Sequence, residues 1–367
     1  MRLLICAGGT GGGVYPALTV LQAVKNKTED ILWVGSQGGI ETALVERAQI
    51  PFKTIPSAGV HGIGLKTLPG NIWKLVQGFF QSIKILREFK PDVILYTGGY
   101  VAVPMAIAGI RIPSTLFVPD IEPALALKFL SRFTDNIAVS TEESESFYPT
   151  KKVVNTGYPT REEFQNWTKK SSRESLKING NKPVLLVFGG SQGARSINRA
   201  IQSNLLDLLS RFEIIHVSGE GNWEEVQTYK SSIPDEMKAD YHIFPYLHEQ
   251  MGAAFSAADL IISRSGASIL GELPLFGLPA ILAPYPHAWN YQRINAQYLA
   301  SRNAALVVED QDMEMNLMPT INSVFDHPDK LKSMAAAMRA LYRPDAAIKI
   351  GEVIINSIKK SGKGDNS

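Results

Sequence analysis

The feature that most constrains the fold is a repeated unit of an apolar run, a glycine-rich turn and a helix start. The first copy runs from Leu3 through the glycines of residues 8–13 into a helix expected to end near Asn26. The second runs from Val184 through residues 189–194 into a helix that opens at Ile197. A Rossmann-like domain begins in this way, because the glycines allow a tight turn and a close backbone approach to a ligand. Two copies predict two Rossmann-like domains that face a cleft.

Short apolar runs alternate with helical stretches through both halves, which predicts mostly parallel, doubly wound α/β sheets. The sequence becomes polar and charged between Arg161 and Lys182, as is typical of a domain junction. We therefore expect an N-terminal domain over residues 1–160 and a C-terminal domain over 161–344. Further helices are expected over residues 75–89 and 345–362.

Composition excludes several classes of protein. A chain of 367 residues suffices for two domains, and its net charge of +2 gives no argument for nucleic acid. Cys6 is the only cysteine, so no disulfide framework exists and a reducing cytoplasm fits. The longest apolar run, residues 100–110, falls short of the roughly 20 residues that cross a bilayer. The histidines lack the spacing to cysteines or carboxylates that a metal site needs, so we expect no metal.

The stretch from Leu260 to Asn295 carries the clearest chemistry. A short apolar strand leads into the small, polar turn 263–268, and a helix carrying Glu272 follows. The free N–H groups and the dipole of such a helix start favour a phosphate. A carboxylate this close to a diphosphate is better placed to accept hydrogen bonds from a sugar diol such as ribose. The alternative is an ordinary βαβ unit in which Glu272 only caps its helix.

The first unit alone would also suit a nicotinamide enzyme. That class uses an acidic residue at the end of the second strand to bind ribose. Here the run 31–34 ends in Gly35-Ser36-Gln37, without a carboxylate. The sequence therefore argues against a nicotinamide cofactor.

The stretch 260–295 resembles the donor-binding region of the MurG family of GT-B glycosyltransferases, and the resemblance extends over nearly the whole chain. The matching positions are Ser265-Gly266-Ala267, Glu272, Gly277-Leu278-Pro279-Ala280, Pro284, His287, Gln292 and Asn295-Ala296. The resemblance implies an inverting transfer of N-acetylglucosamine from UDP-GlcNAc to the 4-hydroxyl of the muramyl sugar of lipid I. Lipid I is the undecaprenyl-diphosphate-linked muramyl-pentapeptide, and the product is lipid II of peptidoglycan. It also implies no cofactor and a peripheral place on the cytoplasmic face of the cell membrane.

Donor-binding residues follow from the same resemblance, which gives UDP-GlcNAc to the C-terminal domain and the acceptor to the N-terminal one. It implies that Arg161 reaches the diphosphate, that Glu272 binds ribose and that Gln292 contacts sugar hydroxyls. It also implies that the helix 345–362 returns to the first domain. The full donor set is Thr10, Gly11, Gly12, Arg161, Ser191, Gln192, Tyr246, Leu247, Ala267, Ser268, Glu272 and Gln292. The alternatives are that Arg161 is a surface arginine of the domain junction, that Ser191 and Gln192 only form a turn, and that Tyr246 is a core aromatic.

The sequence departs from the family where a catalytic base is expected. The family's first glycine loop usually ends in His, and here the residue is Gly13. The transfer still needs a group that takes the proton of the attacking hydroxyl. Asp120 and Glu122 follow a predicted strand at its carboxyl end and are our candidates for that group. The alternative is a solvated or capping pair, and His61 is the only histidine of the first domain.

A membrane-binding patch is predicted on residues 68–89. Trp73, Phe79 and Phe80 could form an apolar face with lysines and arginines around it, a combination that fits an anionic membrane surface. The alternative is a helix whose apolar side packs on the sheet.

Two other functions stay open at the level of sequence. One is a GT-B glycosyltransferase with another lipid or natural-product acceptor, which the altered motifs of the first domain suggest. The other is a catalytically silent nucleotide-sugar-binding protein, which Gly13 suggests.

Overall fold

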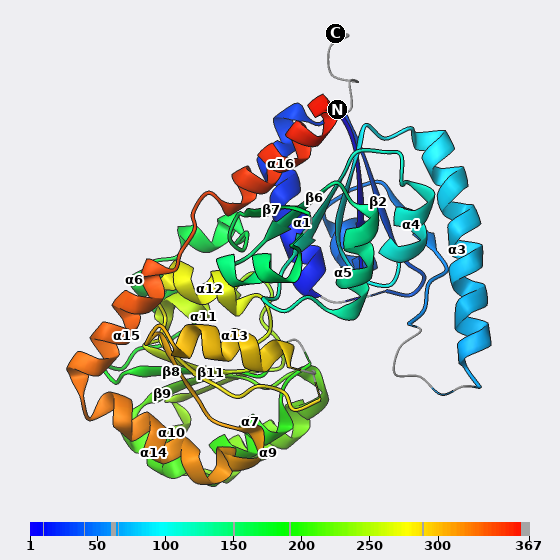
Figure 1. Cartoon of the computed structure of the whole chain (residues 1–367). Helices are drawn as coiled ribbons and strands as arrows, with labels where there is room; N and C mark the ends of the chain where they lie inside the picture. Colours follow the sequence, from blue (N-terminus) through cyan, green and yellow to red (C-terminus); the bar gives the residue numbers. More distant parts are fainter. Residues whose placement is uncertain are drawn as a thin grey trace. The chain divides into compact units, whose positions relative to one another are not determined.

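The computed structural model describes residues 1–9, 11–39, 41–59, 64, 66–149, 151–190, 192–287 and 290–360. The chain divides into two compact units (Figure 1). The first comprises Met1–Thr160 together with Arg343–Ser367, and the second comprises Arg161–Tyr342. Thus the end of the chain belongs to the unit with which the chain begins.

The first unit is built on a parallel sheet with the strand order β3-β2-β1-β4-β5-β6-β7. Its central strands are fully buried because helices cover both faces, which explains why they read as continuous apolar runs. The strands are β1 (Arg2–Ala7), β2 (Asp30–Ser36), β3 (Phe52–Ile55), β4 (Val93–Gly98), β5 (Ser114–Val118), β6 (Asn136–Val139) and β7 (Lys152–Asn155). The helices are α1 (Gly11–Val24), α2 (Glu41–Arg47), α3 (Leu68–Phe89), α4 (Ala102–Ala108), α5 (Leu125–Leu130) and α16 (Ala346–Lys360).

The last helix, α16, lies against α1 on one face of this sheet (Figure 1, red beside dark blue). Ile350 and Ile354 on α16 are fully buried. A Cβ on Gly351 would lie 2.5 Å from Cγ1 of Val24, so glycine lets the two helices approach closely at this point. The amphipathic pattern of the C-terminal segment is therefore satisfied inside the first unit.

Helix α3 begins at Leu68, seven residues before the predicted start at Leu75. Pro69 stands in its first turn, where the missing N–H costs no hydrogen bond, so this proline opens the helix rather than breaking it. Only a narrow side of α3 is buried, through Gly78, Ser82, Ile85 and Leu86. The rest of the helix surface is open to solvent or partly covered.

The second unit contains a parallel sheet with the order β10-β9-β8-β11-β12-β13. Its strands are β8 (Val184–Phe188), β9 (Glu213–Val217), β10 (Tyr241–Phe244), β11 (Leu260–Ser263), β12 (Ala280–Leu282) and β13 (Ala305–Val307). Its helices are α6 (Lys169–Ser175), α7 (Arg195–Ser203), α8 (Leu205–Arg211), α9 (Trp223–Ser232), α10 (Asp235–Lys238), α11 (Met251–Ala257), α12 (Ile269–Phe276), α13 (Tyr291–Ala300), α14 (Met313–Phe325) and α15 (Pro328–Ala340). Together with the first sheet, this confirms the prediction of two Rossmann-like, doubly wound domains.

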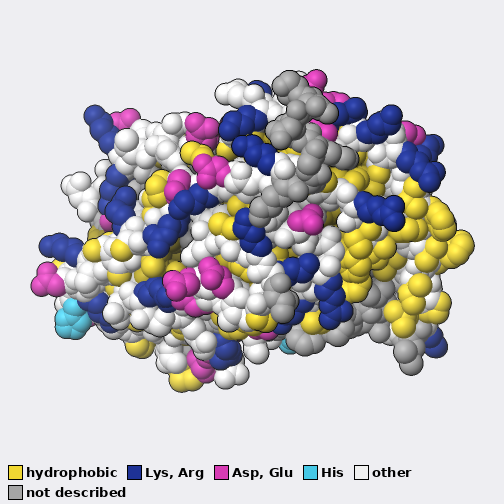
Figure 2. Space-filling view, turned by 45° about the horizontal axis from the view of Figure 1, so that its top comes forward, with side chains coloured by type: hydrophobic (Ala, Val, Ile, Leu, Met, Phe, Trp, Pro, Cys, Tyr) yellow, Lys and Arg dark blue, Asp and Glu magenta, His cyan; other side chains and the backbone are white. Residues whose placement is uncertain are grey.

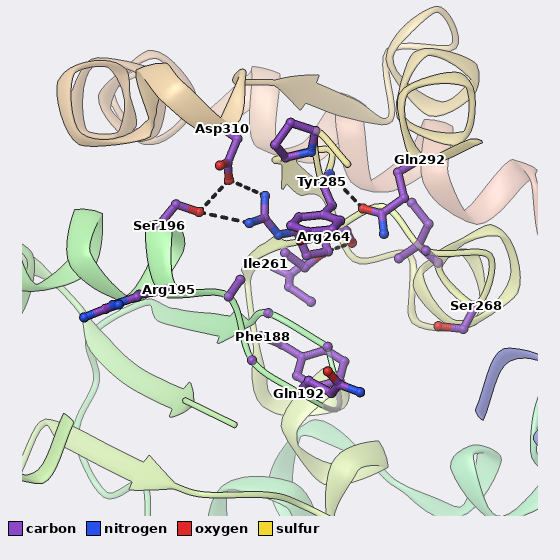
Figure 3. A pocket seen from close by; sticks show the side chains of 18 of the residues that line it. Phe188, Gln192, Arg195, Ser196, Ile261, Arg264, Ser268, Tyr285, Gln292 and Asp310 are labelled. Carbon is purple, nitrogen blue, oxygen red and sulfur yellow. Dashed lines mark hydrogen bonds and ion pairs between the residues drawn. The ribbon is translucent and has the colours of Figure 1, made fainter. Parts of the chain in front are cut away.

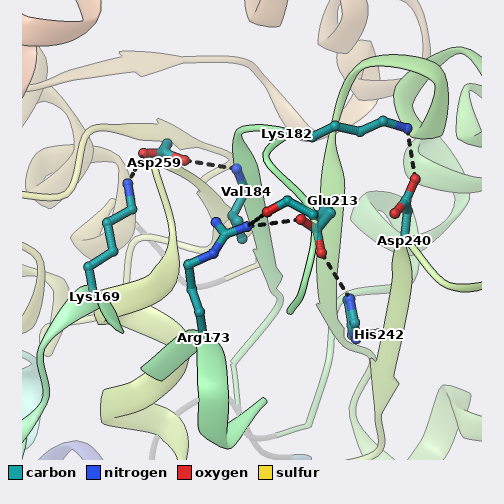
Figure 4. A network of polar contacts seen from close by, with 9 residues as sticks. Lys169, Arg173, Lys182, Val184, Glu213, Asp240, His242 and Asp259 are labelled. Atoms are coloured by element: carbon teal, nitrogen blue, oxygen red, sulfur yellow. Dashed lines mark hydrogen bonds and ion pairs between the residues drawn. The ribbon is translucent and has the colours of Figure 1, made fainter. Parts of the chain in front are cut away.

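A buried charge network ties α6 to the sheet of the second unit (Figure 4). The carboxylate of Glu213 is almost fully buried and accepts a hydrogen bond of 2.9 Å from Nη2 of Arg173. Its other oxygen lies 3.5 Å from Nε2 of His242. Since Glu213 opens β9, these charges gather at the amino ends of the strands, away from the carboxyl ends where such sheets bind ligands.

Candidate functional site

A cavity of about 730 Å³ opens in the second unit at the carboxyl ends of β8 and β11 (Figure 3). These two strands are neighbours at the point where the strand order reverses, which is where open α/β sheets bind ligands. Its polar lining includes Gln192, Arg195, Ser196, Asn222, Arg264, Ser268, Glu272, His287, Gln292 and Asp310. The position alone marks the cavity as the candidate ligand site.

The glycine turn after β8 forms one wall of the cavity. Gly190 and Gly193 have φ angles of 95° and 77°, a left-handed conformation that favours glycine. A Cβ on Gly189 would lie 2.2 Å from the backbone nitrogen of Ala194, so the turn closes on itself too tightly for any side chain. The side chain of Gln192 lines the cavity, whereas Ser191 lies outside the described residues.

Arg264 lies at the centre of the opposite wall and was missed by the sequence analysis (Figure 3). Its guanidinium donates to the carbonyl oxygen of Ala283 at 3.0 Å and to Oγ of Ser196 at 2.9 Å. It also forms an ion pair with Asp310, which accepts a further hydrogen bond from Ser196. One guanidinium therefore joins the end of β12, the first turn of α7 and the segment before α14.

The structure brings two of the predicted donor residues together. Nη2 of Arg161 lies 3.3 Å from Oε1 of Glu272, and the guanidinium also stacks 3.8 Å from the ring centre of Phe164. Burial raises the pKa of Glu272 above its usual value, while Arg161 and the side chain of Ser268 act in the opposite direction. The cavity is therefore lined by a buried carboxylate, and its cationic partner Arg161 lies behind it, outside the described lining.

Gln292 and Ser268 also line the cavity. Oε1 of Gln292 accepts a hydrogen bond of 2.9 Å from the backbone N–H of Tyr285, which leaves its NH2 group facing the cavity (Figure 3). Ala267 is buried within the turn 263–268 and is not among the described residues that line the cavity. Tyr246 and Leu247 are not among the described residues that line the cavity, and the ring of Tyr246 packs on His248 at 4.6 Å.

In the first unit the glycine loop that follows β1 is held by a carboxylate. Glu41 is fully buried and accepts hydrogen bonds from the N–H of Gly9 at 3.1 Å and of Ser36 at 2.6 Å. Its oxygen would lie 2.3 Å from a Cβ on Gly8 or Gly39, which explains both glycines. The second strand ends without a carboxylate of its own, as the sequence indicated, but Glu41 reaches that place from α2. Its oxygens are already taken up by the chain's own amides.

The candidate catalytic carboxylates follow the carboxyl end of β5. Asp120 is half-buried, and Glu122 forms an ion pair of 3.2 Å with Nζ of Lys128. For Glu122 to take up a proton, it would have to give up or share that ion pair. Gly11 and Gly12 open α1 of the same unit, and Thr10 and His61 lie outside the described residues.

The described residues offer neither a metal site nor a membrane-spanning helix. In the part of the chain that the structure describes, no three His, Cys, Asp or Glu side chains gather in a way that could hold a metal ion. No described helix is long and apolar enough to cross a membrane.

Comparison with known proteins decides the family. Residues 3–139 match the glycosyltransferase family 28 N-terminal domain, and residues 184–350 match the corresponding C-terminal domain. The UDP-N-acetylglucosamine--N-acetylmuramyl-(pentapeptide) pyrophosphoryl-undecaprenol N-acetylglucosamine transferase of Listeria monocytogenes serotype 4a is 35% identical over 369 residues, covering 98% of this chain and 100% of that one. The same transferase of Roseiflexus sp. is 36% identical over 412 residues, covering 95% and 93%. The crystal structure of Acinetobacter baumannii MurG superposes with a TM-score of 0.76 at 26% identity, covering 97% of this chain and 99% of that one.

The chain belongs to the MurG family.

A more distant structure, a UDP-GlcNAc 2-epimerase from Neisseria meningitidis bound to UDP-GlcNAc, superposes with a TM-score of 0.67 at 15% identity. That likeness concerns the fold alone. Membership of the MurG family confirms the GT-B fold and makes the chain a glycosyltransferase. The first glycine loop of this chain departs from the family pattern, because Gly13 stands where the family usually has a histidine.

The departure at Gly13 has a local structural correlate. A Cβ at this position would lie 3.0 Å from the backbone oxygen of Thr97, whose hydroxyl donates to the carbonyl oxygen of Gly13 at 2.7 Å. A side chain such as the usual MurG-family histidine would need Thr97 to shift by a few tenths of an ångström. In this chain the start of α1 therefore packs directly on the end of β4, and Gly13 offers no proton acceptor on a side chain.

Proposed function

We propose that the protein transfers N-acetylglucosamine from UDP-GlcNAc to the 4-hydroxyl of the muramyl sugar of lipid I, which forms lipid II for peptidoglycan. The observation that carries this proposal is full-length similarity to transferases named for this reaction, combined with a cavity at the strand-order switch that retains Glu272. UDP-GlcNAc and lipid I are thus the proposed partners.

The proposed reaction proceeds with inversion in one displacement. The muramyl oxygen attacks the anomeric carbon, the bond from that carbon to the diphosphate breaks, and UDP leaves with the electron pair. A base takes the hydroxyl proton during the attack. We assign this role to Asp120 first and Glu122 second, because both follow the carboxyl end of β5 in the unit to which we assign the acceptor.

The donor side stabilises the leaving diphosphate. We place the diphosphate against the turn 263–268, of which Gly266 and Ser268 line the cavity, and we assign the guanidinium of Arg161 to pair with it. Glu272 accepts hydrogen bonds from the ribose diol, and Gln292 uses its amide on the sugar hydroxyls. Gly11, Gly12, Thr10 and Ser191 complete the proposed glycine-loop contacts, with Tyr246 and Leu247 at the uracil. No cofactor takes part in this scheme.

The direct test is transfer of radiolabelled GlcNAc from UDP-GlcNAc to lipid I by the purified protein. We expect labelled lipid II and release of UDP. Binding of UDP without transfer to lipid I would contradict the proposal. It would favour either a different acceptor, to be sought among other lipid-linked sugars, or a silent nucleotide-sugar-binding protein.

We also propose that the protein binds the cytoplasmic face of the cell membrane peripherally through α3. Trp73 and Phe80 are 62% and 65% exposed, and Phe79 packs edge-on against Phe80 at 5.6 Å. Ile72 and Val76 extend the same exposed surface. Figure 2 shows apolar side chains gathered along the side where α3 lies, with Lys and Arg side chains at their border. Such a border favours anionic lipid headgroups.

We expect the protein to sediment partly with vesicles that contain anionic lipid, and high salt to release some of it. Replacing Phe79 and Phe80 together with Ser should reduce the bound fraction, because both side chains are then too polar to enter the interface. Ile348→Ser is a suitable control, since Ile348 is 58% exposed on α16 of the same unit. If the double variant folds and still partitions as the wild type does, α3 is not the membrane-binding element.

A further inference from the structure

A hydrogen-bonded network of buried polar side chains lies behind the cavity of the second unit. Tyr241 and His216 are fully buried, and Asn198 is 2% exposed. They come from β10, β9 and α7, and none of the three lines the cavity. Three polar side chains in a core are costly unless each is hydrogen-bonded, so their contacts need an explanation.

The hydrogen bonds assign a donor and an acceptor to each contact of this network when the imidazole of His216 is neutral. Nδ2 of Asn198 donates to the carbonyl oxygen of Ser218 at 3.1 Å, so Oδ1 of the same amide is an acceptor. Nε2 of His216 lies 3.0 Å from that Oδ1 and must therefore carry a proton. Nδ1 of His216 then accepts from the hydroxyl of Tyr241 at 2.7 Å. A neutral imidazole protonated at Nε2 satisfies all three contacts.

The network ends at the carbonyl oxygen of Ser218, which supports the wall of the cavity. The same oxygen accepts from Nδ2 of Asn222 at 3.4 Å. It also lies so close to Gly193 that a Cβ on Gly193 would come within 2.1 Å of it. Asn222 and Gly193 both line the cavity. The position of one carbonyl group therefore decides how the glycine turn and the start of α9 meet the ligand.

We propose that His216 is a positioning residue of the donor site: its neutral imidazole orients the Asn198 amide, which holds the Ser218 carbonyl against the glycine turn that lines the UDP cavity. The inference rests on the proposed function in taking UDP as the ligand. Nothing in it requires His216 to touch UDP. Its effect passes through Asn198 and Ser218 to Gly193.

Two further observations agree with a permanently neutral His216. Burial lowers its pKa to about 3, so the imidazole stays neutral at any pH used for an assay. Burial also raises the pKa of Tyr241, with a smaller contribution from the nearby Tyr229, so the phenol keeps its proton. At this end of the network, Lys230 donates to the backbone oxygen of Tyr241 at 2.6 Å.

The test compares UDP affinity with thermal stability in three variants of the full chain. His216→Leu removes both hydrogen bonds and should weaken UDP binding about tenfold in calorimetry performed well below its unfolding temperature. His216→Gln keeps an amide that can donate to Asn198 and accept from Tyr241. Its UDP affinity should therefore lie close to that of the wild type. Tyr241→Phe removes only the outer donor and should cost about threefold. The KM for UDP-GlcNAc should rise with these losses while the KM for the acceptor stays unchanged.

His327→Leu is the matched control, because His327 is exposed and precedes α15 outside the cavity. Nitrogen NMR of histidine-labelled wild type should show one imidazole protonated at Nε2 that does not titrate between pH 5 and 9. If His216→Leu or, should it not fold, Tyr241→Phe loses thermal stability but binds UDP as tightly as the wild type, the network only supports the fold and the proposal is wrong. A wild type that does not bind UDP overturns the proposed function itself, and this inference with it.

Discussion

Asp120→Asn is expected to lower the rate of transfer to lipid I by about 10²–10⁴-fold, because a positioned base contributes roughly that factor. The amide cannot take the proton of the attacking hydroxyl, although it keeps the size of the carboxylate. UDP affinity should not change, since the donor cavity lies in the other unit. Steady-state rates with saturating UDP-GlcNAc and calorimetry with UDP measure the two quantities separately.

Glu122→Gln tests the second candidate base. Glu122 is ion-paired with Lys128, so its replacement also releases an ammonium group, and we expect a smaller loss of rate than for Asp120→Asn. Glu145→Gln is the control, an exposed carboxylate of the same unit. Transfer that survives in both Asp120→Asn and Glu122→Gln would rule out a carboxylate base. His61 or a substrate-assisted route would then be the remaining explanations.

Glu272→Ala is expected to weaken the binding of both UDP and UDP-GlcNAc by about 10- to 100-fold, which corresponds to roughly 1.5–3 kcal/mol for lost hydrogen bonds to a charged acceptor. The carboxylate lines the cavity beside Arg161, so the variant also leaves that guanidinium without one of its partners. Calorimetry at fixed salt gives the two affinities. Equal affinities in variant and wild type would show that Glu272 does not bind the ribose.

The pKa of Glu272 separates a binding role from a structural one. Burial raises this pKa, so the ionised carboxylate is disfavoured in the folded protein relative to the unfolded chain. The associated stability is present below the unfolded pKa and is lost as the pH rises through the folded one. Ionised Glu272 therefore lowers the free energy of unfolding at neutral pH. We expect Glu272→Gln to lose UDP affinity without losing thermal stability, and Glu236→Ala, on the exposed α10, to change neither.

Membership of the MurG family has a clear sequence basis in the turn 263–268, the helix with Glu272 and the residues up to Asn295. These signals are local, because strand, turn and helix start are adjacent in the chain. The base is harder to predict. Gly13 removes the family's histidine, and a proton acceptor supplied from another loop leaves no pattern of spacing.

The sequence by itself determined the fold class, because each apolar run, glycine turn and helix start is a short-range signal and a parallel sheet follows from their alternation. It also placed Glu272 and Gln292 at the carboxyl ends of strands. Only the tertiary structure decided which distant groups meet. Arg161 and Glu272 are 111 residues apart, and Ser196 and Asp310 are 114 apart. The tertiary structure also brought Glu41 under the first glycine loop and joined Tyr241, His216 and Asn198 behind the second. Such contacts depend on how helices pack on a sheet. This packing involves the whole domain, so no single segment of the sequence predicts it.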